Sequence, residues 1–270
     1  METGVRERSI IITGGAAGIG LATAKRLSAD GWRVGLIDLS EDSLAEIKTQ
    51  LGDTRVAVAS ADVSDASSLS GAIDQLAEEL NGIDAIFNNA GILRDGPFTE
   101  VALADHHLTI AVNAAGVVNG CHLAIPHLEK RSGVKHIINM SSASTIHGIG
   151  GLSVYSATKA FVEHLSEALD IELSRSNIKL STIAVPFVQT AMIDAESDQM
   201  KGYVKEQKQP IVPEDVANRV AAILDGSASG RMHQLISPQL KFQHLLRRIV
   251  STSTMHNIAK RAFEKTAAAN

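Results

Sequence analysis

The sequence lacks most of the features that mark secreted, disulfide-bonded or nucleic-acid-binding proteins. It contains one cysteine, Cys121, so no internal disulfide can form, which suits a reducing compartment. Its formal net charge of −5 argues against nucleic-acid binding, which needs a basic surface. The charged N-terminus leads into the first apolar run without a secretory signal pattern. No uninterrupted apolar segment approaches the roughly 20 residues that span a bilayer, so we expect a cytoplasmic protein.

Aromatic residues are scarce, at 3 %, but apolar residues make up 44 % of the chain, enough for one sizeable core. Short runs rich in Ile and Val alternate with amphipathic stretches of helical length, which is typical of strands covered on both faces. Strands are predicted at residues 9–13, 33–38, 55–60, 84–88, 135–140, 179–185 and 232–236. Helices are predicted at residues 19–29, 41–51, 66–80, 103–128, 153–175 and 213–224. This alternation predicts an α/β fold with a doubly wound parallel sheet of about seven strands and helices on both faces.

Two regions depart from this alternation, and neither indicates a domain boundary. Residues 189–212 have no regular pattern and are interpreted as a mobile loop near the substrate. Residues 239–270 form a basic extension with apolar residues at helical spacing. We therefore expect a single dinucleotide-binding and catalytic domain over residues 1–270, with a helical C-terminal extension.

The first predicted strand runs into a glycine-rich turn that precedes the first predicted helix. Gly14, Gly18 and Gly20 have the spacing Gly-x3-Gly-x-Gly, with Ala17 and Ile19 between them. Glycines let the backbone approach a pyrophosphate closely, and the positive end of the following helix attracts the anion. Many ordinary turns are also glycine-rich, but the position between strand and helix favours a phosphate site.

Asp38 ends the second predicted strand, 18 residues after Gly20. A carboxylate there can accept hydrogen bonds from ribose hydroxyls and would repel a 2′-phosphate. The neighbouring Leu39 offers no positive charge for such a phosphate, so the sequence favours NAD over NADP. Asp38 could instead cap the next helix, a role that Ser40 could fill equally.

Tyr155 and Lys159 lie one turn apart near the start of a predicted helix, so their side chains share a face. Oxidation of an alcohol needs a base for the hydroxyl proton, and reduction of a ketone needs the matching acid. A free phenol has a pKa of about 10, which a nearby ammonium would lower. A surface Tyr–Lys pair without function is the alternative interpretation.

These motifs together resemble the short-chain dehydrogenase/reductase family, whose Thr-Gly-x3-Gly-x-Gly pattern is matched in full from Thr13 to Gly20. Ser142 lies 13 residues before Tyr155, as the family's catalytic serine does. The resemblance implies a catalytic set of Asn113, Ser142, Tyr155 and Lys159. In these roles Tyr155 is the general acid/base, and Lys159 lowers its pKa and binds the nicotinamide ribose. Ser142 positions the substrate oxygen, and the backbone of Asn113 holds a water on the proton path.

The resemblance also implies where the cofactor NAD would lie. Asp62 and Val63 match the adenine contacts, and residues 88–91 match the tetrapeptide that passes along the adenosine ribose. The family's Pro-Gly-x-Val-x-Thr turn is altered here, because Pro186 stands where glycine is expected. The implied cofactor-binding residues are Gly14, Ala17, Gly18, Ile19, Gly20, Asp38, Leu39, Asp62, Val63, Asn89, Ala90, Gly91, Tyr155, Lys159, Pro186, Val188 and Thr190.

Substrate residues are expected in the loops after strands four, five and six, beyond the carboxyl ends of the sheet. The candidates are Leu93, Ser144, His147, Phe187, Met192 and Ile193. Most are apolar, which favours a hydrophobic alcohol such as a steroid-like, terpenoid or aryl carbinol. His147 could equally be a solvent-facing loop residue. The remaining histidines are scattered, and we predict no metal.

The sequence thus predicts an NAD(H)-dependent oxidoreductase that interconverts a secondary alcohol and its ketone. The alternatives are a 3-oxoacyl-thioester reductase and a non-catalytic NAD-binding scaffold. The resemblance further implies a homodimer or homotetramer. The extension at residues 239–270 departs from familiar family members. It is interpreted as packing over the substrate mouth or on a neighbouring subunit, with weak contact with a membrane surface as the alternative.

Overall fold

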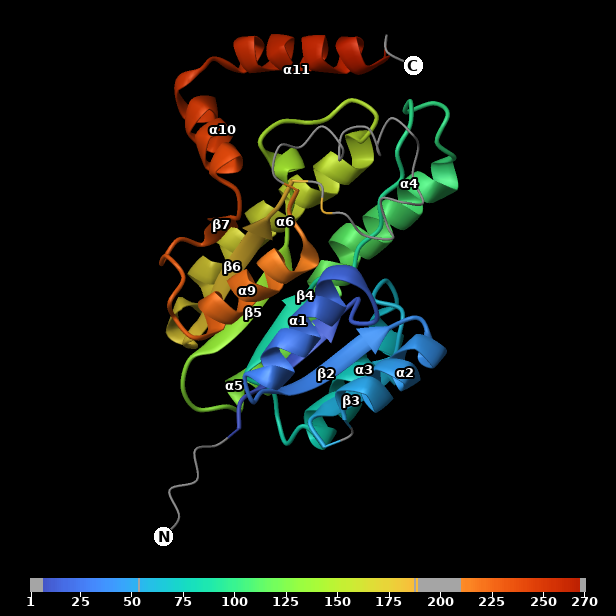
Figure 1. The fold of residues 1–270 in the computed structure, drawn as a ribbon, viewed down its shortest axis with the longest axis vertical. Coiled ribbons are helices and arrows are strands. Elements are labelled where there is room, and N and C mark those ends of the chain that lie inside the picture. Colours follow the sequence, from blue (N-terminus) through green and yellow to red (C-terminus); the bar gives the residue numbers. More distant parts are fainter. Residues whose placement is uncertain (1–6, 53, 187, 189–209, 268–270) are drawn as a thin grey trace.

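The computed structural model describes residues 7–52, 54–186, 188 and 210–267. Its sheet has seven strands, all parallel, in the order β3-β2-β1-β4-β5-β6-β7 (Figure 1). The strands are β1 (Ser9–Thr13), β2 (Arg33–Asp38), β3 (Val56–Ser60), β4 (Ala85–Asn88), β5 (Lys135–Met140), β6 (Ile178–Ala184) and β7 (His233–Leu235). The predicted doubly wound parallel sheet is confirmed, and no strand end differs from its predicted position by more than one residue.

Helices cover both faces of the sheet (Figure 1). They are α1 (Gly18–Ala29), α2 (Glu41–Leu51), α3 (Ala66–Glu79), α4 (Leu103–Ile110), α5 (Gly116–Glu129), α6 (Ser153–Glu172), α9 (Pro213–Leu224), α10 (Pro238–Ile249) and α11 (Thr252–Ala267). Ile10 and Ile12 pack in a core under α1, α2 and α9, whereas Ile11 packs under α3, α5 and α6. Alternate residues of one strand thus serve opposite cores, which explains the unbroken apolar runs in the sequence.

The direction of winding reverses at β1, which pairs with β2 on one side and β4 on the other. Such a reversal opens a crevice at the carboxyl ends of the two diverging strands. The turn after β1 carries the predicted glycine motif, and the turn after β4 carries residues 89–91. The fold therefore brings the two predicted nucleotide-binding segments to one place.

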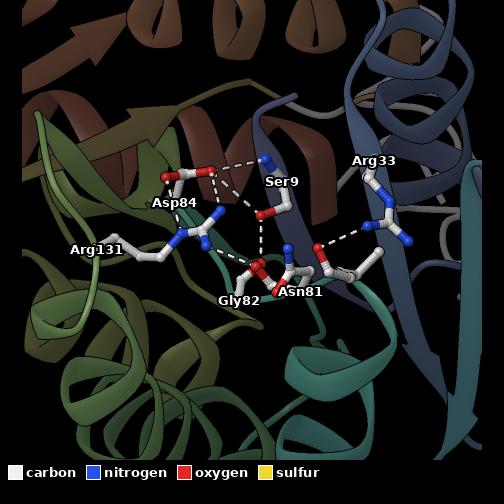
Figure 2. A network of polar contacts seen from close by, with 7 residues as sticks. Ser9, Arg33, Asn81, Gly82, Asp84 and Arg131 are labelled. Atoms are coloured by element: carbon white, nitrogen blue, oxygen red, sulfur yellow. Dashed lines mark hydrogen bonds and ion pairs between the residues drawn. The ribbon is translucent and has the colours of Figure 1, made fainter. Parts of the chain in front are cut away.

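Polar contacts hold the opposite, amino-terminal ends of β1 and β4 together (Figure 2). The Ser9 backbone N–H donates to Asp84 Oδ2 over 3.0 Å. Arg131, which follows α5, lies 3.4 Å from the same carboxylate, which is 4 % exposed. A nearly buried carboxylate needs such a partner, because an unpaired charge is costly to bury. The network stabilises the pairing of the two strands between which the crevice opens.

The predicted helix over residues 103–128 is interrupted in its middle. A π-helical turn, Ala111–Ala115, separates α4 from α5 and contains Asn113. By length and composition, Leu103–Glu129 could cross a membrane, although no apolar segment of that length was expected from the sequence. In the fold this stretch packs on the sheet through Val117, Cys121 and Ala124, which are all buried. A core helix meets the same criteria of length and apolarity.

Candidate active site

The glycine turn after β1 adopts a backbone that other residues resist. Gly14 and Gly18 have φ values of +64° and +49°, in the left-handed region that favours glycine. A Cβ on Gly20 would lie 2.0 Å from the carbonyl oxygen of Gly14. Ala17, the N-cap of α1, has no side-chain oxygen to accept from the first helical amides. Those amides are therefore suited to an anion such as a pyrophosphate.

Hydrogen bonds join this turn to the turn after β4. Thr13 Oγ1 accepts from the backbone N–H groups of Asn89 and Ala90, each over 3.1 Å. The Asn89 side chain donates to the carbonyls of Thr13 and Gly14 over 3.0 and 3.1 Å. The sequence identified Thr13 only as the first residue of the family's glycine pattern. Its role in joining the two turns depends on the pairing of β1 with β4, which the pattern does not reveal.

Asp38 does not cap α2, because Ser40 Oγ fills that role by accepting from Ser43 N over 3.2 Å. Instead, Asp38 Oδ2 accepts from Ala16 N over 2.9 Å, and Oδ1 accepts from Leu39 N over 2.8 Å. The carboxylate thus braces the glycine turn. Each carboxylate oxygen has a second lone pair that can accept from a ligand hydroxyl.

A cavity of about 250 Å³ runs from Asp38 to Tyr155 and Lys159 on α6. Its lining residues are Gly14, Ala17, Gly18, Ile19, Asp38, Asn89, Ala90, Gly91, Leu93, Met140, Ser141, Ser142, Tyr155, Lys159, Val185, Pro186 and Val188. Most of the predicted cofactor residues therefore surround one space. Met140, Ser141 and Val185 also line it, and sequence reasoning missed them. Met140 and Val185 are the last residues of the predicted strands 135–140 and 179–185, so their place at the carboxyl edge of the sheet was a signal that could have found them.

Several predicted cofactor residues do not line this cavity. Gly20 lies behind the turn, where its missing side chain permits the close approach to Gly14. Leu39 is 70 % exposed. Asp62 Oδ1 accepts from both the backbone and the hydroxyl of Ser64, and Val63 packs against Gly116 at the start of α5. These residues border the site or support it from outside.

Among the predicted substrate residues, Leu93 alone is both described and part of the cavity lining. Ser144 is 2 % exposed, and its Oγ has no hydrogen-bond partner among the described residues. His147 Nδ1 lies 3.0 Å from the carbonyl oxygen of Gly148, consistent with the alternative of a loop histidine. The predicted residues outside the described part of the chain are Phe187, Thr190, Met192 and Ile193, with most of the predicted 189–212 loop.

Tyr155, Ser142 and Lys159 converge on the end of the cavity away from Asp38. The Ser142 side chain hydrogen-bonds to Tyr155, and Lys159 Nζ lies 5.7 Å from the centre of the tyrosine ring. Ser142 Oγ accepts from Ser144 N over 3.1 Å, which leaves its hydroxyl proton to be donated toward the phenol or a substrate oxygen. Lys159 Nζ donates to the Met140 carbonyl over 3.0 Å. The three side chains are placed as acid/base chemistry on a hydroxyl requires.

Burial controls the ionisation of this group in the protein itself. It lowers the pKa of Lys159 to about 8. It raises the pKa of Tyr155, and the hydrogen bond with Ser142 partly opposes that change. Burial disfavours the charged form of either group, so the phenol resists losing its proton and the ammonium loses its proton more easily. The raised pKa of Tyr155 differs from the expectation that the Lys159 ammonium would lower it, because burial is the largest influence on the phenol. The phenolate consequently needs positive charge at the site, which Lys159 supplies in its protonated form.

Asn113 uses its side chain to hold the loop after β4. Its Oδ1 accepts from Ile92 N and its Nδ2 donates to Ile92 O, each over 2.8 Å. A Cβ on Gly91 would lie 3.2 Å from Asn113 Oδ1 and 3.6 Å from Lys159 Nζ. With its side chain engaged, only the backbone of Asn113 can take the predicted role toward a water. Its π-helical turn is a feature frequent at functional sites.

Glu163, one turn beyond Lys159 on α6, holds the segment around Ser142 from both sides. Its Oε1 accepts from Ser141 Oγ over 2.8 Å and from Thr145 Oγ1 over 3.1 Å. Sequence reasoning missed this residue, although its helical spacing from Tyr155 and Lys159 was visible. No metal-binding group of three or more His, Cys, Asp or Glu side chains occurs in the described part of the chain.

Comparison with known proteins agrees with this geometry. The sequence model of the short chain dehydrogenase family matches residues 8–201. L-2,3-butanediol dehydrogenase from Corynebacterium glutamicum is 35 % identical over 229 residues, which cover 78 % of this chain and 89 % of the relative. Levodione reductase from Leifsonia aquatica is 31 % identical, covering 72 % of this chain and 74 % of the relative.

Solved structures share the fold. A short chain dehydrogenase/reductase from Burkholderia phymatum in complex with NAD superposes with a TM-score of 0.80 at 24 % identity, covering 90 % of this chain and 93 % of that one. The chain belongs to the short-chain dehydrogenase/reductase family, as its motifs predicted. It is accordingly an oxidoreductase that acts on CH–OH groups.

Proposed function

We propose that the protein is an NAD(H)-dependent dehydrogenase that interconverts a hydrophobic secondary alcohol and its ketone, with Tyr155 as general acid/base. One observation carries the proposal: Tyr155 and Ser142 line the same cavity as the glycine turn and Asp38. A scaffold that only binds a nucleotide has no need of the acid/base group at the other end. The thioester reductase alternative is not favoured by any feature of the described cavity.

The cavity residues fit a dinucleotide without a 2′-phosphate. The amides of the glycine turn would hold the pyrophosphate, and Asp38 would accept from the adenosine ribose hydroxyls. The acidic Asp38 has no basic neighbour in the cavity lining at that end. Structures of similar fold have been solved with NAD and with NADH, which supports the choice of NAD.

Each catalytic side chain has a distinct task. Bound NAD⁺ would accept the hydride from the carbinol carbon. Tyr155 takes the hydroxyl proton during oxidation and returns it during reduction. Ser142 donates a hydrogen bond to the substrate oxygen, and the Lys159 ammonium stabilises the Tyr155 phenolate against the burial that opposes it. The backbone of Asn113 links Lys159 to solvent through a water.

The lining near Tyr155 supports an apolar substrate. Leu93 packs with Leu152 beside Tyr155. Val185, another lining residue, accepts at its carbonyl from the backbone N–H of Ala143, next to Ser142. Apolar walls of this kind bind hydrophobic substrates better than polyhydroxylated sugars. The relatives named for butanediol and levodione act on small alcohols or ketones.

We further propose that the protein is a cytoplasmic homodimer or homotetramer. A second, apolar cavity of about 700 Å³ lies along α4, α5 and α6. Ile110, Val118 and Phe161 on these helices are 47, 39 and 46 % exposed. An apolar surface of this extent on a soluble enzyme is best explained by subunit contact.

A panel of hydroxysteroids, terpenoid alcohols, aryl carbinols and 3-hydroxyacyl thioesters, each assayed with NAD⁺ and NADP⁺, tests the proposal. We expect turnover of a hydrophobic secondary alcohol with NAD⁺ and a much weaker response with NADP⁺. Consistent preference for NADP⁺, or for the thioesters alone, would contradict it. Analytical ultracentrifugation checks the oligomer, and a monomer at micromolar concentration would contradict that part.

A further inference from the structure

The helices α10 and α11 form an arm, residues 238–267, that leaves the edge of the sheet after β7. Figure 1 shows α11 at one extremity of the molecule, beyond α4 and α6. The inner side of the arm is packed: Leu240 and Met255 form a buried cluster with Ile146. Arg247 donates to the carbonyl oxygen of Thr145. The arm thus has a defined position, against the loop that follows Ser142.

The outer side of α10 carries an apolar stripe that is largely exposed. Phe242, Leu245 and Ile249 recur at helical spacing and are 65, 57 and 77 % exposed. Ile258 of α11 is 51 % exposed. Three large apolar side chains on one short surface helix form a patch that soluble proteins keep for a partner. The packed inner side shows that exposure of the stripe does not result from a detached helix.

Charge is distributed unequally between the arm and the rest of the chain. Residues 238–270 contain six Lys and Arg but one acidic residue, Glu264, for a formal net charge of +5. The remainder of the chain carries −10. A partner for the arm must therefore offer both an apolar phase and negative charge.

We propose that the arm docks the protein on the surface of a membrane that contains anionic lipid. The apolar stripe would enter the boundary between headgroups and acyl chains, while lysines and arginines contact lipid phosphates. The other candidate occupant is a second copy of the chain, but the surface proposed above for subunit contact does not suit the arm. The apolar cavity along α4, α5 and α6 has no carboxylate in its lining to match the charge of the arm.

Docking in this way would bring the active-site loop close to the bilayer. Thr145 and Ile146, which the arm contacts, lie three and four residues after Ser142 in the chain. If the substrate is a hydrophobic alcohol, as proposed above, the cavity would then lie beside the phase in which such alcohols concentrate. The membrane contact itself does not depend on that substrate.

Co-sedimentation of the full-length protein with vesicles tests the proposal. One set of vesicles contains phosphatidylcholine alone, and the other also contains phosphatidylglycerol. We expect the protein to sediment with the anionic vesicles and to be released by high salt. The triple variant F242S/L245S/I249S should lose at least about tenfold in binding. The matched control Ile171→Ser removes a side chain that is 75 % exposed on α6 and should bind as the wild type does.

Circular dichroism and gel filtration of the same proteins complete the test. The triple variant should keep the wild-type spectrum and oligomeric state, because the substituted side chains face solvent. No sedimentation of the wild type, or equal sedimentation of the triple variant, overturns the proposal. A smaller oligomer for the triple variant also overturns it, because the stripe would then be an interface between copies of the chain.

Discussion

The two ends of the cavity are built by different means. At the Asp38 end the site consists of the backbone of the glycine turn, held by positive φ angles and by the missing side chain of Gly20, together with one carboxylate, Asp38. At the Tyr155 end it consists of side chains whose ionisation is altered by burial. Substitutions at the first end should therefore change cofactor binding, through steric fit in the glycine turn and through lost hydrogen bonds at Asp38. Substitutions at the second end should act through charge and change turnover.

The largest effect is expected for Gly20→Ala. Its Cβ would meet the Gly14 carbonyl at 2.0 Å, so the glycine turn must deform. We expect NAD binding to fall below detection by calorimetry, together with a lower melting temperature. Gly71→Ala is the matched control, since this helical glycine has nothing within 4 Å of an added Cβ. Equal cofactor affinity of the two variants would show that the turn does not hold the cofactor.

Lys159→Met should lower turnover by about 10²-fold, because the phenolate loses its positive partner. The Lys159→Met variant should nevertheless have a higher free energy of unfolding than the wild type near neutral pH. The reason is that the wild type buries an ammonium on a residue that is only 4 % exposed. Between pH 8, the lowered pKa, and 10.5, the ordinary value, the unfolded state binds more protons than the folded state. Wild-type stability therefore rises through this window.

The variant lacks that rise, so its advantage in free energy of unfolding should shrink from pH 8 to 10.5. Chemical denaturation at several pH values measures the difference. Lys25→Met, which removes an exposed lysine of α1, is the control and should follow the wild-type pH profile. A pH-independent difference for Lys159→Met would mean that Lys159 is not held with a lowered pKa.

Asp38→Ala should raise the KM for NAD⁺ about tenfold or more, because hydrogen bonds to charged groups contribute about 1.5–3 kcal/mol. The discrimination against NADP⁺ should fall at the same time, while kcat with saturating NAD⁺ stays near the wild-type value. Steady-state kinetics with both dinucleotides measures these quantities. An unchanged NAD⁺ to NADP⁺ ratio would remove Asp38 from cofactor selection.

The smallest effect is expected for Glu163→Ala. Losing the acceptor for Ser141 and Thr145 should loosen the segment around Ser142 and lower kcat several-fold, with little change in the KM for NAD⁺. Glu163→Gln keeps an oxygen at the same place and should restore most of the activity. Equal losses in both variants would indicate that charge, and not positioning, is what Glu163 contributes.

Strands and helices could be predicted because the inner strands are buried on both faces and the helices that cover the sheet on one. Ile10 to Ile12 give an unbroken apolar run for that reason. The glycine turn and the Tyr155–Lys159 pair were predictable because their spacing is set within one turn or one helix. Ser142 was predicted only through the resemblance to the family, and Asp38 through its place at the end of the second strand. The π-helical turn at Asn113 was not, since its residues have no propensity that distinguishes them from an ordinary helix.

Long-range contacts account for the other differences. Glu163 reaches Ser141 over 22 residues, and Thr13 reaches Asn89 over 76. Such pairs depend on which strands are neighbours and on where each strand ends. The absence of Asp62 from the cavity lining has a local origin instead, because its carboxylate accepts hydrogen bonds from Ser64, two residues further along the chain.

Tyr155→Phe tests the central claim most directly, when turnover and NAD affinity are measured on the same preparation. Removing the phenol oxygen leaves the cavity walls and the glycine turn in place. We predict that NAD⁺ still binds within about twofold of the wild-type affinity while turnover falls by about 10²–10⁴-fold. A variant that turns over at the wild-type rate would contradict the assignment of Tyr155 as the acid/base.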